Sequence, residues 1–88
     1  MSYDYQKERA GLFTEHGVET LTVIRDNAKL LLKAAGAFTA GHAFEKATGS
    51  SWTMLAALDY LVEKGEIVRV TRDGDTWGQH QVFTAPRQ

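Results

Sequence analysis

Cysteine is absent from this 88-residue chain, and proline and long apolar runs are scarce. Without cysteine, neither a disulfide nor a thiolate metal site can form. Proline occurs once, at Pro86, and no apolar run approaches the roughly 20 residues that a membrane-spanning helix needs. The first residues lack the basic start and apolar segment of a signal peptide. We therefore expect a soluble, cytoplasmic protein that does not associate with membranes.

An excess of positive charge is also lacking. The chain has 10 basic and 11 acidic side chains, for a net charge of -1. Residues 1–38 carry five of each sign, residues 39–64 carry two basic and three acidic groups, and residues 65–88 carry three of each. Most DNA-binding modules have a basic footprint, because neutralising phosphates supplies much of their affinity. No such basic block stands out here.

Patterns typical of catalysis and metal binding are missing as well. No HExxH or His/carboxylate cluster has ligand spacing, and the glycines separate helical segments instead of forming a phosphate loop. His42 and Glu45 lie three residues apart on one expected helix, which could orient the imidazole, but a hydrogen-bonded or exposed histidine is the simpler interpretation. The other histidines, His16 and His80, are isolated. We predict no enzyme activity, no cofactor and no metal.

With 43% hydrophobic and 24% charged residues, the composition is that of one globular domain spanning residues 1–88. A first helix is predicted from Tyr3 to His16, within an N-terminal segment 1–17, with Gly17 as its terminator. Its apolar stripe is loose. Two roles stay open for this helix, packing on the back of the domain or acting as a dimerisation arm.

An amphipathic helix is predicted next, from Glu19 to Ala35, ended by Gly36. The β-branched stretch from Thr20 to Ile24 leaves a second option, an extended start with Asp26 as a late N-cap. Residues 37 and 38 form a short extended link, and Phe38 is expected in the core.

Two further helices are predicted around a tight turn. Thr39 caps a helix from Ala40 to Thr48, which Gly49 ends, and Ser50 or Ser51 caps a second helix that ends at Lys64. The buried face of this second helix combines four apolar residues, Met54, Ala57, Leu58 and Leu61.

A hairpin closes the chain. Gly65 fits the left-handed position after the helix, and Ile67 to Val70 has β-branched character. Asp73-Gly74 is a strong two-residue turn signal, and the return strand is predicted from Trp77 to Thr84.

This order of elements resembles the winged helix-turn-helix superfamily. The most specific part is the phrase from Leu58 to Ile67 followed at once by a hairpin, and the resemblance covers residues 19–85. It implies an α+β fold of three or four helices with a C-terminal two-stranded wing. It also implies that the helix after the turn enters the major groove of DNA while the wing touches the adjacent backbone.

The resemblance therefore implies duplex DNA binding, in a small bacterial or phage-type transcriptional regulator that acts as a dimer. The groove-facing positions would be Ser50, Ser51, Trp52, Thr53, Leu55, Ala56 and Asp59. Lys46, Arg69 and Arg72 would contact phosphates, with His80 as a neighbour. The pattern departs from the family here, because Trp52, Leu55 and Ala56 are apolar and Asp59 would repel phosphate.

An alternative belongs to a different class. A winged-helix adaptor or inhibitor, encoded by a phage or mobile element, would bind a protein partner and not DNA. Trp52, Leu55 and Trp77 would then be its aromatic and aliphatic anchors. Trp52 has a third interpretation, as a core residue that folds back onto the first helices. The wing, with charges of both signs, could equally be a solvated hairpin.

Overall fold

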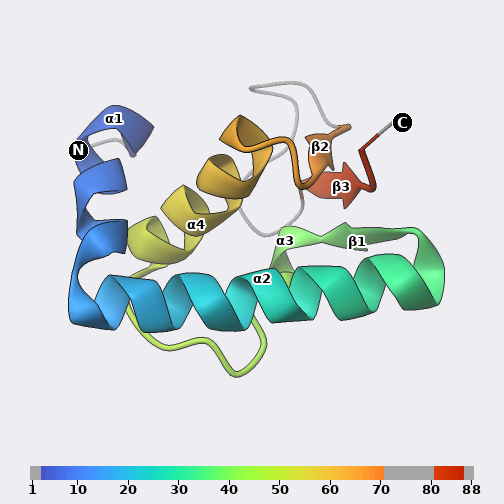
Figure 1. Ribbon diagram of the computed structural model, residues 1–88, viewed down its shortest axis with the longest axis horizontal. Helices are drawn as coiled ribbons and strands as arrows, with labels where there is room; N and C mark the ends of the chain where they lie inside the picture. Colours follow the sequence, from blue (N-terminus) through green and yellow to red (C-terminus); the bar gives the residue numbers. More distant parts are fainter. Residues whose placement is uncertain (1–2, 71–80, 87–88) are drawn as a thin grey trace.

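The computed structural model describes residues 3–70 and 81–86. Their elements follow the order α1 (Tyr5–Glu8), a 3-10 helix η1 (Arg9–Phe13), α2 (Glu15–Ala35), β1 (Ala37–Thr39), α3 (Ala40–Ala43), α4 (Ser51–Glu63), β2 (Val68–Arg69) and β3 (Val82–Thr84). Helices pack beside a small sheet (Figure 1), so the predicted α+β class is confirmed.

The long helix α2 begins earlier than predicted. Thr14 is its N-cap, with the side chain accepting a 3.1 Å hydrogen bond from the Gly17 amide, and Gly36 ends it at φ +78°. The prediction of a first helix ended by Gly17 is therefore wrong, and so is the extended start capped by Asp26. Gly17 lies inside the first turn of α2, where a Cβ would approach the carbonyl oxygen of Gly11 to 1.9 Å. Close approach of two segments, and not helix termination, explains this glycine.

The helices on either side of the turn agree better with the sequence. Thr39 caps α3 and Ser50 caps α4 as predicted, and α4 ends at Glu63, one residue before the expected Lys64. Gly65 adopts φ +74°. Helix α3, however, stops at Ala43 and not at Thr48.

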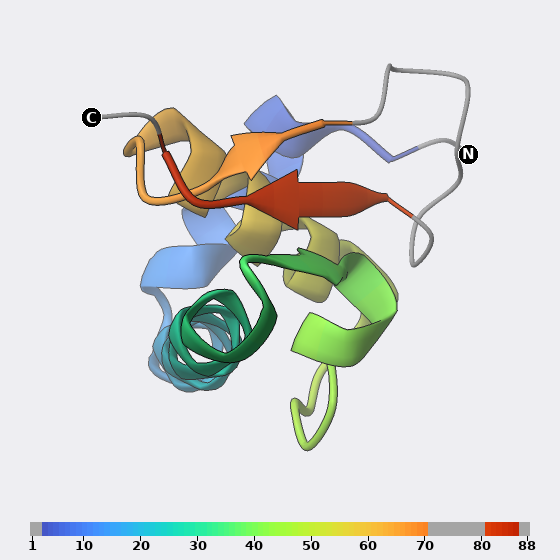
Figure 2. The same cartoon turned by 90° about the vertical axis from the view of Figure 1, so that its right-hand side faces the viewer.

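The sheet has three antiparallel strands in the order β1-β3-β2, with Phe83 of β3 opposite both Phe38 and Arg69. Figure 2 shows β3 between its two neighbours. The predicted link at residues 37–38 is thus part of strand β1, because its backbone groups pair with β3. The described part of the return strand begins at Val82, while the predicted turn at Asp73-Gly74 and the start at Trp77 lie outside the described residues.

The core lies between α2, α4 and the inner face of the sheet. Its fully buried large side chains are Phe83, Leu12, Ile24, Leu58 and Leu61, and the predicted core residue Phe38 is buried and stacks on Phe83 with a centroid distance of 5.5 Å. Leu12 comes from η1, so the N-terminal segment belongs to the same core. No helix of the described ranges is both long and apolar enough to cross a membrane.

Candidate functional site around helix α4

The start of α4 is an exposed helix N-terminus with hydroxyl groups. The Ser50 hydroxyl accepts a 3.1 Å hydrogen bond from the Thr53 amide and lies 2.9 Å from the Thr53 hydroxyl. Ser50 and Ser51 are exposed, whereas Thr53 is half-buried. The remaining free amides of the first turn and the helix dipole favour an anion at this end.

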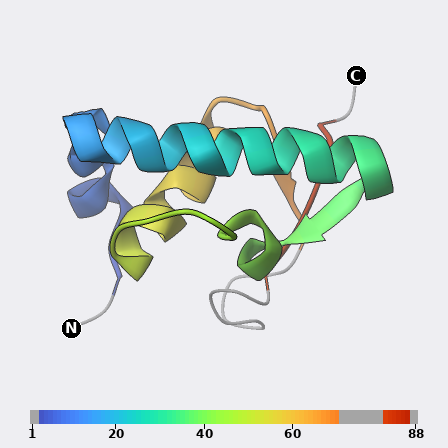
Figure 3. The same cartoon turned by 90° about the horizontal axis from the view of Figure 1, so that it is seen from below.

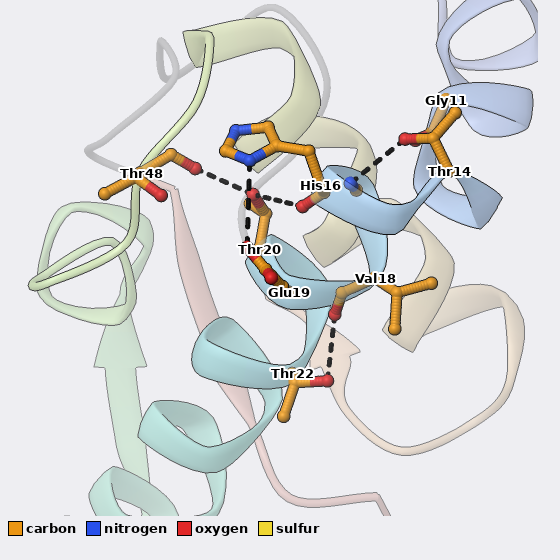
Figure 4. A network of polar contacts seen from close by, with 9 residues as sticks. Gly11, Thr14, His16, Val18, Glu19, Thr20, Thr22 and Thr48 are labelled. Atoms are coloured by element: carbon orange, nitrogen blue, oxygen red, sulfur yellow. Dashed lines mark hydrogen bonds and ion pairs between the residues drawn. The ribbon is translucent and has the colours of Figure 1, made fainter.

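The turn before α4, residues 44–50, is held in place by polar side chains of α2. The buried Thr20 hydroxyl donates to the Thr48 carbonyl at 2.7 Å, as Figure 4 shows. Asn27 donates to the carbonyls of Ala43 and Glu45, at 2.9 and 2.7 Å. Because these carbonyls are taken by side chains, α3 ends early and the turn does not continue as helix. Figure 3 shows this turn running below α2.

Lys46 lies at the exposed part of this turn, in a left-handed conformation with φ +65°. A non-glycine residue in that conformation carries a steric cost, which the neighbouring hydrogen bonds offset. The lysine is therefore presented on a fixed backbone. Gly49, at φ +119°, completes the turn, and a Cβ there would come within 3.2 Å of the His16 ring.

The apolar candidates of α4 are partly exposed. Trp52 and Leu55 are half-buried. Met54 is among the half-buried side chains that pack against the core, whereas Trp52 and Leu55 are not. Ala56, by contrast, is fully buried, so its placement on a groove-facing surface is wrong. The α4 face that is open to a partner is thus narrower than the sequence suggested, and it lies toward the start of the helix.

Arg69 is turned toward α4. Its guanidinium forms an ion pair with Asp59, lies 5.6 Å from the centroid of the Phe83 ring, and leaves a buried Nε without a hydrogen-bond partner among the described residues. Asp59 also accepts a 2.6 Å hydrogen bond from the Tyr3 hydroxyl. Burial and the bond to Asp59 raise the pKa of Tyr3 above its ordinary value. These contacts join the N-terminus, α4 and β2.

The N-terminal segment, residues 3–13, makes side-chain contacts with the second half of α4. Arg9 makes a bidentate ion pair with Glu63, with N–O distances of 3.0 and 2.8 Å, and the Tyr5 hydroxyl donates to the same carboxylate at 2.8 Å. Phe13 meets Tyr60 edge to face at 5.6 Å. Sequence reasoning missed these contacts, since they join residues more than 40 positions apart.

Acid titration should reveal the Glu63 contacts. The hydrogen bonds from Arg9 and Tyr5 lower the pKa of Glu63 from 4.5 to about 2. A lowered pKa in the folded state contributes stability that is present above about pH 4.5 and is lost as the pH falls toward 2. We expect Glu63→Gln to reduce the loss of unfolding free energy between about pH 4.5 and 2, measured by urea unfolding at each pH. Glu45→Gln, at an exposed position whose side chain contacts no described charged group, is the control and should leave this part of the profile unchanged.

Paired arginines are the dominant electrostatic feature of the described residues. Arg9, Arg25 and Arg69 each form an ion pair, with Glu63, Glu66 and Asp59 respectively. All three carboxylates lie on α4 or in the loop that follows it. Arg69 was predicted to contact phosphate, and its pairing makes a structural role the simpler interpretation. Two further predicted site residues, Arg72 and Trp77, lie outside the described residues, as does His80.

The two histidines in the described part of the chain, His16 and His42, make local contacts. No group of three or more His, Asp or Glu side chains there could hold a metal ion. The His42 ring lies 3.2 Å from the Thr39 hydroxyl and not against Glu45, so the imidazole belongs to the cap of α3. His16 lies 3.9 Å from Glu19 on the surface of α2.

Comparisons with known proteins give no relative: no family model, no curated protein and no solved structure matches this chain.

Proposed function

We propose that the chain is a winged helix-turn-helix domain that binds duplex DNA as a small transcriptional regulator. The order of its elements supports this: α3, a tight turn and α4 are followed by two antiparallel strands, and β1 completes the sheet in the order β1-β3-β2. In the superfamily that the sequence resembles, the helix after the turn meets the major groove with its N-terminal residues, and the hairpin is the wing.

The available groups favour phosphate contact over base readout. Ser50, Ser51 and the free amides of the first turn of α4 can donate to phosphate, and Lys46 supplies a positive charge in the turn that precedes α4. Trp52 and Thr53 would lie against sugar or a thymine methyl. No arginine, lysine, asparagine or glutamine follows within α4, so base discrimination through bidentate contacts is not expected.

The wing contributes less positive charge than the sequence suggests. Arg69 is occupied by Asp59, so phosphate contact from the wing would fall to Arg72. We therefore expect only two or three neutralised phosphates. The logarithm of the affinity should then fall with the logarithm of the salt concentration with a slope of about -2 to -3.

The proposal can be tested by titrating the whole chain into labelled mixed-sequence duplex DNA. Fluorescence anisotropy measures the affinity at several salt concentrations. Lys46→Ala should weaken binding uniformly across sequences and reduce the salt slope by about 1. Lys33→Ala, which removes the same charge from the last turn of α2, is the matched control and should leave the slope unchanged. Absence of binding by the folded protein at low salt would reject the DNA proposal, and equal effects of the two variants would reject this interface.

A second function is favoured by the paired arginines. With Arg9, Arg25 and Arg69 all bound to carboxylates, the described surface offers a duplex lysines but no arginine outside an ion pair, while Trp52 and Leu55 remain partly exposed at the start of α4. A protein partner, anchored on these two side chains and on Trp77, is the second proposal. A homodimer is one form of it, although the described contacts of the N-terminal segment are with its own chain.

A further inference from the structure

A small cavity lies between the second half of α2 and the segment that runs from the end of α4 to Ile67. Its volume is about 200 Å³, and its lining residues are Arg25, Ala28, Lys29, Leu32, Leu61, Glu66 and Ile67. The site does not include the turn or the first turn of α4, so it is independent of the proposed DNA contact.

The floor of this cavity is apolar and built into the core. Ala28, Leu61 and Ile67 are buried, with exposed fractions of 2%, 0% and 2%, and the half-buried Leu32 forms one wall. Apolar side chains with a few placed polar groups are typical of small-molecule sites. The volume is below the usual range for drug-sized ligands of about 300–1,000 Å³, so it suits a single ring or a short chain.

The rim carries the charge. Arg25 makes a bidentate ion pair with Glu66, through Nε and one Nη at 3.0 Å each, and its other Nη makes no hydrogen bond with a described residue. Lys29 forms no ion pair with any described carboxylate and is exposed. Two cations and one carboxylate give the rim a net charge of +1, which complements a single negative charge.

We propose that this cavity binds a small monoanion with an apolar body, such as an aryl or short alkyl carboxylate. The apolar part fills the space over Ala28, Leu61 and Ile67. The carboxylate lies at the rim, where Lys29 and the free Nη of Arg25 donate to it, because a charge-assisted hydrogen bond requires a donor that is not already used.

A titration of the ¹⁵N-labelled chain with 3-phenylpropionate tests this site by NMR. We expect saturable shifts of backbone amides in residues 28–32 and 61–67, complete by about 10 mM, which is appropriate for so few ligand atoms. The corresponding neutral alcohol, 3-phenylpropanol, should bind more weakly, and the cation 3-phenylpropylammonium should bind more weakly still. Equal shifts from the three compounds, or shifts confined to other residues, would overturn the proposal.

Two variants separate charge recognition from cavity filling. Lys29→Gln should weaken the carboxylate roughly two- to five-fold, the range of an exposed ion pair, and leave the alcohol unchanged. Lys33→Gln, one turn along the same helix and outside the cavity lining, is the matched control and should change neither ligand. Leu32→Gln, at the half-buried wall of the cavity, should weaken both ligands. If Lys33→Gln reduced carboxylate binding as much as Lys29→Gln, the effect would be one of overall charge and the site would be rejected.

Discussion

Replacing Phe83 by alanine is expected to lower the free energy of unfolding by about 3–5 kcal/mol. The ring is fully buried, stacks on Phe38 at 5.5 Å and lies under the Arg69 guanidinium. Its strand pairs with both β1 and β2, so the cavity left behind would be shared by all three strands. A domain of this size has only about 5–15 kcal/mol in total, so the variant should be partly unfolded at 37 °C.

Urea unfolding followed by circular dichroism measures this loss. Phe13→Ala is the control, since it deletes the same side chain from a position that is 54% exposed and contacts Tyr60 at the surface. We expect it to cost about 1 kcal/mol, the contribution of one aromatic pair. Similar losses in the two variants would contradict the assignment of Phe83 to the centre of the core.

Local signals account for the elements that the sequence predicted well. Thr39, Ser50 and Gly65 act through atoms within a few residues of themselves, by capping an amide or adopting a positive φ. Such signals can be recognised without the fold. The apolar spacing of Leu58 and Leu61 likewise predicted the buried face of α4 correctly, since both side chains are buried.

The errors share a different cause, which is contact between distant segments. Residues 37–39 form a strand only because β3 lies beside them, and α3 ends early only because Asn27 binds the carbonyl groups that would continue it. Neither partner can be identified from neighbouring sequence. Ala56 is a similar case. The sequence predicted a surface position, but the side chain is fully buried because α4 is contacted by α1, η1 and α2.

The candidate site was affected in the same way. Sequence reasoning treated Arg69 as a free wing cation, but Asp59, ten positions earlier, forms an ion pair with it. A carboxylate on α4 therefore neutralises the positive charge that Arg69 carries on β2, in addition to repelling phosphate. This pairing shifts the proposed DNA contact toward Lys46 and the start of α4, where backbone amides and hydroxyl groups provide the donors.

Gly17→Ala is the second change with a large expected effect. We expect it to destabilise the protein, although helix propensity alone would predict a stabilisation. Within a helix, alanine is favoured over glycine by about 1 kcal/mol, so an isolated α2 would gain stability. In the folded chain, however, the new Cβ would lie 1.9 Å from the Gly11 carbonyl oxygen and 2.8 Å from the Cα of Leu12. These are backbone atoms, so η1 must move away from α2. We expect a net loss of about 2–3 kcal/mol, the usual cost of overpacking.

Gly11→Ala provides the matched control, because no described atom beyond its chain neighbours and its own helix backbone lies within 4 Å of a Cβ built at that position. It should change stability by less than about 0.5 kcal/mol. The Gly17 variant should also loosen the contacts of the N-terminal segment with α4, since Leu12 is the buried residue that anchors this segment. Faster amide hydrogen exchange in residues 5–13, with slow exchange retained in the second half of α2, would identify this local effect. If Gly17→Ala were as stable as Gly11→Ala, the close approach of η1 to α2 at Gly17 would be contradicted. Gly17 would then be explained only by its local effect on the helix.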